Sequence, residues 1–275
     1  MTGLTPYSPS LLGELDAFLL ELNAAAAEAI LPLFRSDHGL EDKGGDAGFD
    51  PVTKADRGAE QAIRQLISQR YPAHGVIGEE YGRDREDAEF VWVLDPVDGT
   101  RAFVAGLPLW TTLIGLRHNG TPVLGSIGQS FLGEIYIGSA AGSRRVGPDG
   151  ASTPLKCRPC PALSAAVIAT TDADACFNPA ERDAWVKLRT ASRLARFGCD
   201  AYAYAMVAAG TIDLVVEAGL KCWDIDAAIP VIAGAGGSVT DWPGEAVGSE
   251  GGQVIIAGDT AVLGAAVEIL KPAAL

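Results

Sequence analysis

The stretch that decides the fold is WVLDPVDGTRAF, residues 92–103. It begins with an apolar run typical of a buried strand, and Asp95 ends that run. Pro96 fixes φ and cannot donate a hydrogen bond to a neighbouring strand, so we expect the strand to stop there in a turn. This turn would bring the carboxylates of Asp95 and Asp98 and the carbonyl of Val97 toward one point. For either aspartate alone, a solvated acid at a strand end is an equally good interpretation.

Acids also stand at the ends of two further segments. Glu79 and Glu80 follow the strand-like GVIG, and Asp224 and Asp226 follow KCW. Together these carboxylates predict a site, because open α/β architectures place their sites beyond the carboxyl ends of strands. Carboxylates and carbonyls are the ligands that Mg²⁺ takes in proteins, usually with waters and substrate phosphate oxygens. The three histidines are far apart in the sequence, so a zinc site built from them is not expected.

Gly99 and Thr100 open a short helical segment directly after the two aspartates. The free N–H groups and the positive end of this helix would face the same point, where a phosphate could bind. Two cations a few ångströms apart can activate a water and stabilise the leaving oxygen of an in-line displacement. Thr100 and Asp56 are the natural pair to orient that water, with the threonine hydroxyl relaying a proton. Asp56 has a second interpretation, because Thr53 and Asp56 stand at capping-box spacing before a helix.

The first half of the chain predicts helices packed on a largely antiparallel sheet. Apolar residues at helical spacing predict an amphipathic helix over 9–35, and a second helix follows over 57–70. Strand-like segments cover 75–80 and 90–95, and a meander with an Asn-Gly turn covers 111–139. Between the two helices, the Gly- and Asp-rich residues 37–50 lack periodicity, which predicts a mobile loop near a site.

After about residue 150 the predicted strands and helices alternate, which is typical of a doubly wound sheet. One of these helices is expected over 223–237. The change in pattern divides the chain into an N-terminal α+β subdomain, residues 1–150, and a C-terminal α/β subdomain, residues 151–275. The second subdomain would complete the site with Asp224.

Composition restricts the partners and the compartment. The chain has 21 basic and 35 acidic residues, for a formal charge of −14, which argues against nucleic acid and anionic membranes as partners. The N-terminal segment has no basic region ahead of an apolar one, and no apolar run reaches the length of a membrane span. Five cysteines at irregular spacing suit reduced thiols, so we expect a cytoplasmic protein. Cys157 and Cys160 form a C-x-x-C without a second pair, and zinc or redox chemistry is not expected there.

Several segments together resemble the inositol monophosphatase family. These are VTKAD at 52–56, GEE at 78–80, WVLDPVDGTRAF at 92–103 and WDIDAAIPVIAGAGGSVTDW at 223–242. They occur in order over nearly the whole chain, and the joint match is highly specific. The resemblance implies a Mg²⁺-dependent, often Li⁺-inhibited phosphomonoesterase that acts on a small phosphorylated metabolite. It also implies a layered αβαβα sandwich, of mixed α+β and α/β class, and a homodimer.

The resemblance further implies which residues hold two or three Mg²⁺ ions. Glu79, Asp95 and the Val97 carbonyl match the ligands of the first ion, and Asp95, Asp98 and Asp224 match those of the second. Glu79 would also help to hold a third, weaker ion. All of these positions carry the family's residue types.

The catalytic and phosphate-binding positions of the family are also matched. Thr100 and Asp56 correspond to the pair that activates water, and the resemblance implies that Glu79 is catalytic as well. The N–H groups of Gly99 and Thr100 correspond to the phosphate contacts. Because mere binding does not require a water-activating pair, the intact set argues against a non-catalytic phosphate-binding or regulatory protein.

A finer resemblance concerns the substrate. TRAFVAGLPLWTTLIGL at 100–116 and GCDAYAYAMVAAGTIDLVVEAGLKCWD at 198–224 look like the histidinol-phosphate phosphatase branch of the family. In that branch the acids matching Asp200 and Glu217 contact the cationic end of histidinol phosphate. Each also has a structural interpretation, in which Asp200 caps the helix expected over 201–210 and Glu217 ends a strand. An amino group and a protonated imidazole favour carboxylate partners, whereas a polyol offers hydroxyls. The leading hypothesis is hydrolysis of histidinol phosphate in histidine synthesis, and the alternative is an inositol-1-phosphate or broad sugar-phosphate phosphatase.

Overall fold

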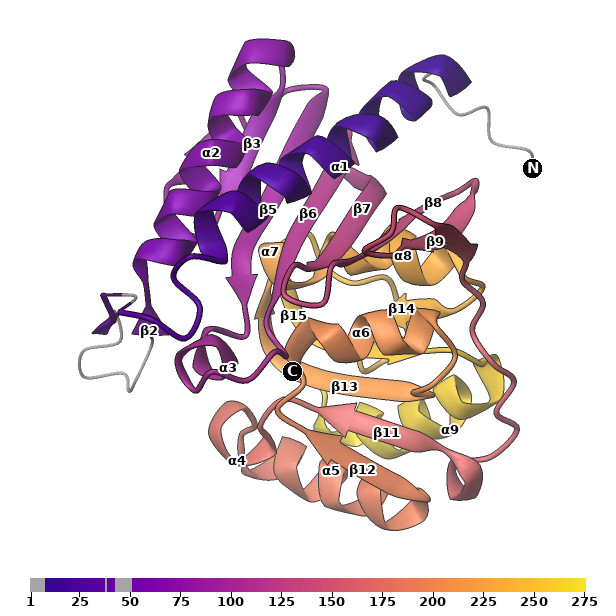
Figure 1. Cartoon of the computed structure of the whole chain (residues 1–275). Helices are drawn as coiled ribbons and strands as arrows, with labels where there is room; N and C mark the ends of the chain where they lie inside the picture. Colours follow the sequence, from indigo (N-terminus) through magenta and orange to yellow (C-terminus); the bar gives the residue numbers. More distant parts are fainter. Residues whose placement is uncertain (1–7, 38, 43–50) are drawn as a thin grey trace.

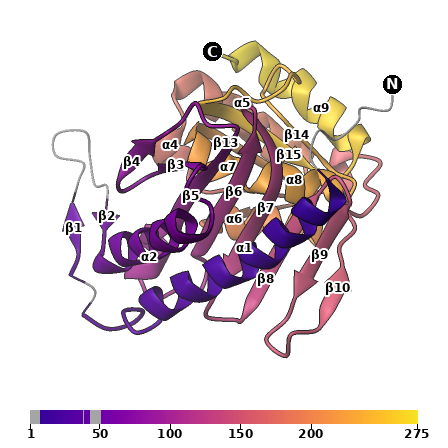
Figure 2. The same ribbon diagram turned by 90° about the horizontal axis from the view of Figure 1, so that it is seen from above.

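Two long helices form the first layer of the molecule, and they run side by side across one face of the larger sheet (Figures 1 and 2). They are α1 (Pro9–Ile30) and α2 (Lys54–Arg70) in a computed structural model that describes residues 8–37, 39–42 and 51–275. α1 ends before the predicted limit at residue 35, because Pro32 has no N–H with which to continue the hydrogen-bonded ladder. Most of the predicted loop over 37–50 lies outside the described residues. Within this range, β1 (Glu41–Asp42) pairs with β2 (Pro51–Val52), which follows directly after the range.

The larger sheet has the strand order β10-β9-β8-β7-β6-β5-β3-β4. All neighbouring strands in it are antiparallel except β3 and β5, which are parallel, so the prediction of a largely antiparallel sheet is confirmed. The predicted Asn-Gly turn joins β6 to β7, and both of its residues have positive φ, as a tight hairpin requires. The strands are β3 (Gly75–Gly78), β4 (Gly82–Asp84), β5 (Phe90–Asp98), β6 (Thr111–His118), β7 (Thr121–Gln129), β8 (Glu134–Ser139), β9 (Gly142–Val146) and β10 (Ser152–Pro154).

The smaller sheet has the order β12-β11-β13-β15-β14, and it is mixed rather than wholly parallel. β15 runs antiparallel to both of its neighbours, whereas β11 is parallel to β12 and to β13. The direction reverses because a loop, and not a crossover helix, connects β14 to β15. The chain passes from the larger to the smaller sheet between residues 154 and 167, and the two-subdomain division stays a prediction. The strands are β11 (Val167–Thr170), β12 (Leu194–Phe197), β13 (Leu214–Lys221), β14 (Ser238–Thr240) and β15 (Gly251–Ala257).

Two helices, α6 (Asp200–Ala208) and α8 (Ala228–Gly234), fill the space between the two sheets (Figure 1). α8 approaches the larger sheet so closely that a side chain at Gly125 would lie 2.2 Å from the carbonyl oxygen of Ala227. The single helix predicted over 223–237 is two helices, α7 (Cys222–Ile225) and α8. Pro230 is the physical reason, because proline has no N–H and its ring clashes with the carbonyl four residues earlier.

The outer face of the smaller sheet carries α4 (Ala173–Cys176), α5 (Pro179–Ala191) and α9 (Thr260–Leu270) (Figure 1). Their apolar faces bury Trp185 and Trp242 against the sheet. The order helix, sheet, helix, sheet, helix confirms the predicted αβαβα sandwich. In the part of the chain that the structure describes, no helix has the length and apolar character needed to cross a membrane.

Candidate active site

β5 brings two of the predicted aspartates to one face of the sheet by means of a bulge. Asp95 pairs with Leu113 and Asp98 with Thr111, so β5 has one residue more than β6 between these two pairs. In a regular strand, residues three apart point to opposite faces, and the extra residue turns both aspartates to the same one. The prediction that Pro96 ends the strand is therefore wrong. Proline is tolerated at bulges, and here β5 continues through Pro96 to Asp98.

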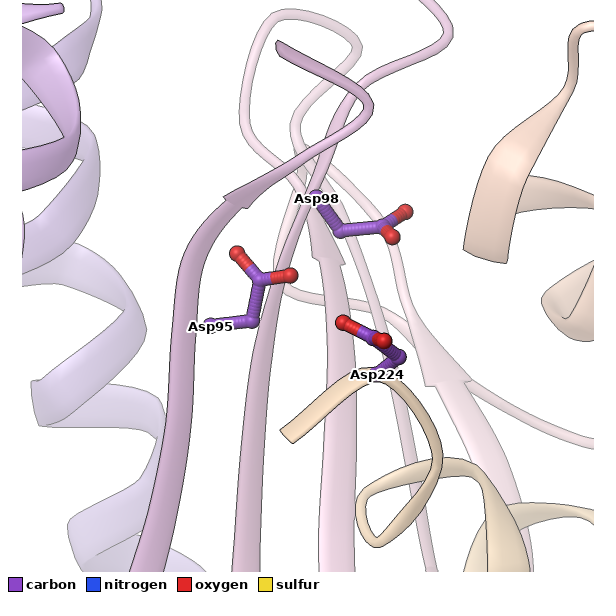
Figure 3. A group of neighbouring side chains, drawn as sticks. All are labelled: Asp95, Asp98 and Asp224. Atoms are coloured by element: carbon purple, nitrogen blue, oxygen red, sulfur yellow. The ribbon is translucent and has the colours of Figure 1, made fainter. Parts of the chain in front are cut away.

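Asp224 approaches these two aspartates from the other half of the chain. It lies on α7, where its Oδ2 accepts the Lys221 N–H at 2.6 Å. One carboxylate oxygen from each of Asp95, Asp98 and Asp224 lies within 4.8 Å of the others. Figure 3 shows the three carboxylates around a shared space. Among residues 8–37, 39–42 and 51–275, this is the one group of three or more acid, histidine or cysteine ligands so close together. We call it the aspartate cluster.

The aspartate cluster is electrostatically unfavourable without a cation. Burial raises the pKa of Asp95 and of Asp98 well above the usual range, and neighbouring carboxylates raise both further. Burial also raises the pKa of Asp224, to about 6. A bound divalent cation reverses such shifts, because it is the largest charge in its site. The residues present therefore fit Mg²⁺, which binds carboxylate and carbonyl oxygens.

Glu79 lies outside the aspartate cluster but close enough to act on it. It follows β3, where its N–H donates to the Leu94 carbonyl of β5 at 3.2 Å. The charge of its side chain is the largest contribution to the raised pKa of Asp95 after burial. The parallel pairing of β3 with β5 is what brings the two strand ends together.

Thr100 and Asp56 meet beside the same bulge. Gly99 has a φ of 81° and leads into α3 (Thr100–Val104). The Thr100 hydroxyl donates to the Val97 carbonyl at 3.1 Å and lies 3.5 Å from Asp56 Oδ1. The other oxygen of Asp56, Oδ2, accepts the Thr53 N–H at 2.7 Å in the predicted capping box of α2. Asp56 is thus both a helix cap and a neighbour of Thr100, and the two interpretations are compatible.

Asp200 and Glu217 line a pocket of about 300 Å³ together with Asp98, Thr100 and Asp224. Asp200 begins α6 with a φ of 44°, and burial raises its pKa to about 6. Glu217 lies on β13 with only 2% of its surface exposed, and burial raises its pKa to about 8. The structure therefore brings both predicted substrate acids to the pocket beside the aspartate cluster.

Other contributors to the pocket and the bulge were missed in the sequence. Thr171 donates its N–H and its hydroxyl to Glu217 Oε1, each at 2.9 Å, and Arg101 and Tyr204 also line the pocket. The Thr112 hydroxyl donates to the Pro96 carbonyl at 2.8 Å and so supports the bulge. Two of them carried a signal: Arg101 follows Thr100 directly, and Thr171 stands at the carboxyl end of a strand.

The raised pKa of Glu217 predicts a distinct pH dependence of stability. An acid with a raised folded pKa stabilises the protein below its unfolded pKa, and this contribution is lost as pH rises through the folded value. With that value at about 8, the metal-free wild type should lose about 3 kcal/mol of unfolding free energy through Glu217 between about pH 5.5 and 8.5. Glu217→Gln should remove this part of the slope. Urea denaturation in EDTA at both pH values measures it, and identical slopes for the two proteins would contradict the assignment.

The sequence model of the inositol monophosphatase family matches residues 11–271. The chain belongs to this family. It is a phosphatase, and the family is known for its dependence on Mg²⁺, which agrees with the oxygen ligands of the aspartate cluster. The match confirms the resemblance seen in the sequence.

Individual members of the inositol monophosphatase family show how far the similarity extends. The chain is 42% identical over 245 residues to the bifunctional phosphatase IMPL2, chloroplastic, of Arabidopsis thaliana, covering 86% of this chain and 68% of that protein. It is 34% identical over 194 residues to a histidinol-phosphatase of Chlorobaculum parvum, covering 70% and 73%. A solved inositol monophosphatase of Zymomonas mobilis has 39% identity and a TM-score of 0.80, covering 91% and 95%. The shared fold extends over nearly the whole chain.

Proposed function

We propose that this protein hydrolyses histidinol phosphate to histidinol and phosphate. The observation that carries the proposal is the pair of acids, Asp200 and Glu217, in the pocket beside the aspartate cluster. An amine-bearing substrate supplies the positive charge that two such acids favour, and its binding would lower the raised pKa of each. Similarity to a protein named histidinol-phosphatase supports the same substrate.

The chain's own oxygen atoms would hold two or three Mg²⁺ ions. The ligands proposed are the carboxylates of Glu79, Asp95, Asp98 and Asp224 and the carbonyl of Val97. Bound there, Mg²⁺ would neutralise the charge of the phosphate group and favour ionisation of water. The N–H groups of Gly99 and Thr100, at the start of α3, would bind phosphate oxygens.

Thr100 and Asp56 would orient the attacking water and remove its proton. The Thr100 hydroxyl lies between the Val97 carbonyl and Asp56 Oδ1, so it can accept a proton from the water as it passes its own to Asp56. Burial raises the pKa of Asp56, which makes this carboxylate a better proton acceptor than an exposed aspartate. No covalent intermediate with the protein is needed.

A polyol phosphate is the second candidate substrate. A carboxyl group with a pKa of about 8 is largely protonated at neutral pH, and the protonated Glu217 could exchange hydrogen bonds with hydroxyls of inositol 1-phosphate. Similarity to an inositol monophosphatase of Zymomonas mobilis supports this alternative.

We also predict that the protein is a homodimer and lies in the cytoplasm. The Arabidopsis relative, by contrast, is chloroplastic by name.

Asp200→Asn tests the choice of substrate. Asparagine tolerates the positive φ of this position, whereas alanine would add backbone strain. We expect kcat/KM for histidinol phosphate to fall by roughly 10- to 100-fold, because a charge-assisted contact is lost, while the value for inositol 1-phosphate changes less than about threefold. Phosphate release from each substrate measures both values.

Asp183→Asn is the matched control for Asp200→Asn. It makes the same change of net charge at an exposed position of α5 and should leave both substrates unaffected. If Asp200→Asn leaves turnover of histidinol phosphate unchanged and inositol 1-phosphate is the better substrate, the histidinol-phosphatase assignment is wrong.

A further inference from the structure

Glu60 is a fully buried acid that the proposed chemistry does not use. It lies on α2 one turn after Asp56, on the same face of the helix, and none of its surface is exposed. Its carboxylate accepts three N–H groups. Oε1 accepts Arg64 Nε at 2.7 Å and the Tyr81 N–H at 3.2 Å, and Oε2 accepts the Glu80 N–H at 2.8 Å.

The two backbone N–H groups belong to the turn that follows Glu79. On its other side, Glu79 is attached to β5 through its own N–H and the Leu94 carbonyl. The backbone on both sides of Glu79 is therefore held, by β5 before it and by Glu60 after it. The last residue of β3 also lies close to this carboxylate, since a Cβ atom at Gly78 would lie 2.0 Å from Glu60 Oε1.

Arg64 completes this arrangement. Its Nε lies against Glu60, and its Nη2 donates to the Gly82 carbonyl at 2.5 Å, at the far end of the same turn. The guanidinium compensates the charge of the buried carboxylate, which would otherwise be costly to bury. Glu60 and Arg64 together bind the turn at three backbone positions.

We infer that Glu60 is a positioning residue that directs the Glu79 carboxylate toward the aspartate cluster. The inference rests on the proposed function, since it assumes that Glu79 binds Mg²⁺. Glutamine cannot replace Glu60, because its amide has only one acceptor oxygen. Its NH₂ group would face an N–H group that now donates a hydrogen bond to the carboxylate. Replacing a group that orients a metal ligand commonly lowers metal affinity by roughly 10- to 100-fold.

The test is calorimetric titration of the folded protein with Mg²⁺ alone, without substrate. Glu60→Gln should weaken Mg²⁺ binding by roughly 10- to 100-fold. Glu181→Gln is the matched control, because Glu181 is also a buried helical acid that accepts a backbone N–H, from Asn178 at 2.7 Å, but outside the pocket. Both variants should unfold at a lower temperature, and only Glu60→Gln should change Mg²⁺ affinity.

Unchanged Mg²⁺ affinity in folded Glu60→Gln, or an equal loss in Glu181→Gln, would overturn the inference. If Glu60→Gln does not fold, Arg64→Met is the variant that tests the inference. It keeps the Glu60 carboxylate but removes the guanidinium that pairs with it and that contacts Gly82. Arg64→Met should weaken Mg²⁺ binding by about threefold or more, and unchanged affinity there would overturn the inference. If the wild type itself binds no Mg²⁺, the proposed function fails, and the inference that rests on it fails too.

Discussion

Asp95→Asn should remove most of the phosphatase activity and, at the same time, stabilise the metal-free protein. Asp95 is 3% exposed, and its charge is opposed by burial and by Glu79, Asp98 and Asp224. The variant loses a charge that would hold Mg²⁺, and we expect kcat/KM to fall by about 10³ or more. It also removes like-charge repulsion, so the unfolding free energy in EDTA near pH 8 should rise by about 1–3 kcal/mol. Asparagine keeps the oxygen that accepts the Val97 N–H.

Asp226→Asn is the control for the sign of this stability change. Asp226 is also buried and lies near Asp224, but it is paired with the Arg117 guanidinium. Removing one partner of a buried ion pair should cost about 3 kcal/mol. Urea denaturation in EDTA compares the two variants, and phosphate release gives the activity. The role of the aspartate cluster would be contradicted if Asp95→Asn kept a tenth or more of the wild-type kcat/KM. A loss of stability like that of Asp226→Asn would contradict it too.

Thr100→Val should lower kcat by roughly 10²- to 10³-fold, as expected for loss of a group that transfers a proton. Valine keeps the branched shape of the side chain but removes the hydroxyl that lies between Val97 and Asp56. The Val97 carbonyl would remain free to bind a cation, so Mg²⁺ affinity should change less than about threefold. Initial rates at saturating Mg²⁺ and a Mg²⁺ titration separate these two effects.

Thr100→Ser is the conservative control for this variant. Serine restores the hydroxyl, and the activity should recover to within about tenfold of the wild type. If Thr100→Val has a normal kcat, or if it loses Mg²⁺ binding in proportion to its activity, the hydroxyl does not relay the proton.

The features that were predicted correctly depend on local physical chemistry. The capping box of Thr53 and Asp56 needs only residues three apart, and it lies where the sequence predicted it. The Asn-Gly turn between β6 and β7 is equally local. The bulge of β5 could not be derived in this way, because it exists only through the pairing of Asp95 and Asp98 with Leu113 and Thr111.

Two other features of the fold follow from residues that the sequence shows directly. Pro230 forbids a continuous helix over 223–237 by its clash with the fourth residue before it. Glu60 is an acid among Ala59, Ile63 and Ile67 on the buried face of α2, and such a position calls for a partner. Its backbone partners are the N–H groups of Glu80 and Tyr81, which follow the next strand. The sequence does not predict this pairing, because it forms only when the turn folds against the helix.

The most direct test of the account is phosphate release by the wild type from histidinol phosphate and from inositol 1-phosphate, each with Mg²⁺ and with EDTA. We predict that release requires Mg²⁺ and that kcat/KM is at least about tenfold higher for histidinol phosphate. Release that continues undiminished in EDTA would contradict the role of the aspartate cluster. An equal or higher kcat/KM for inositol 1-phosphate would contradict the role of Asp200 and Glu217.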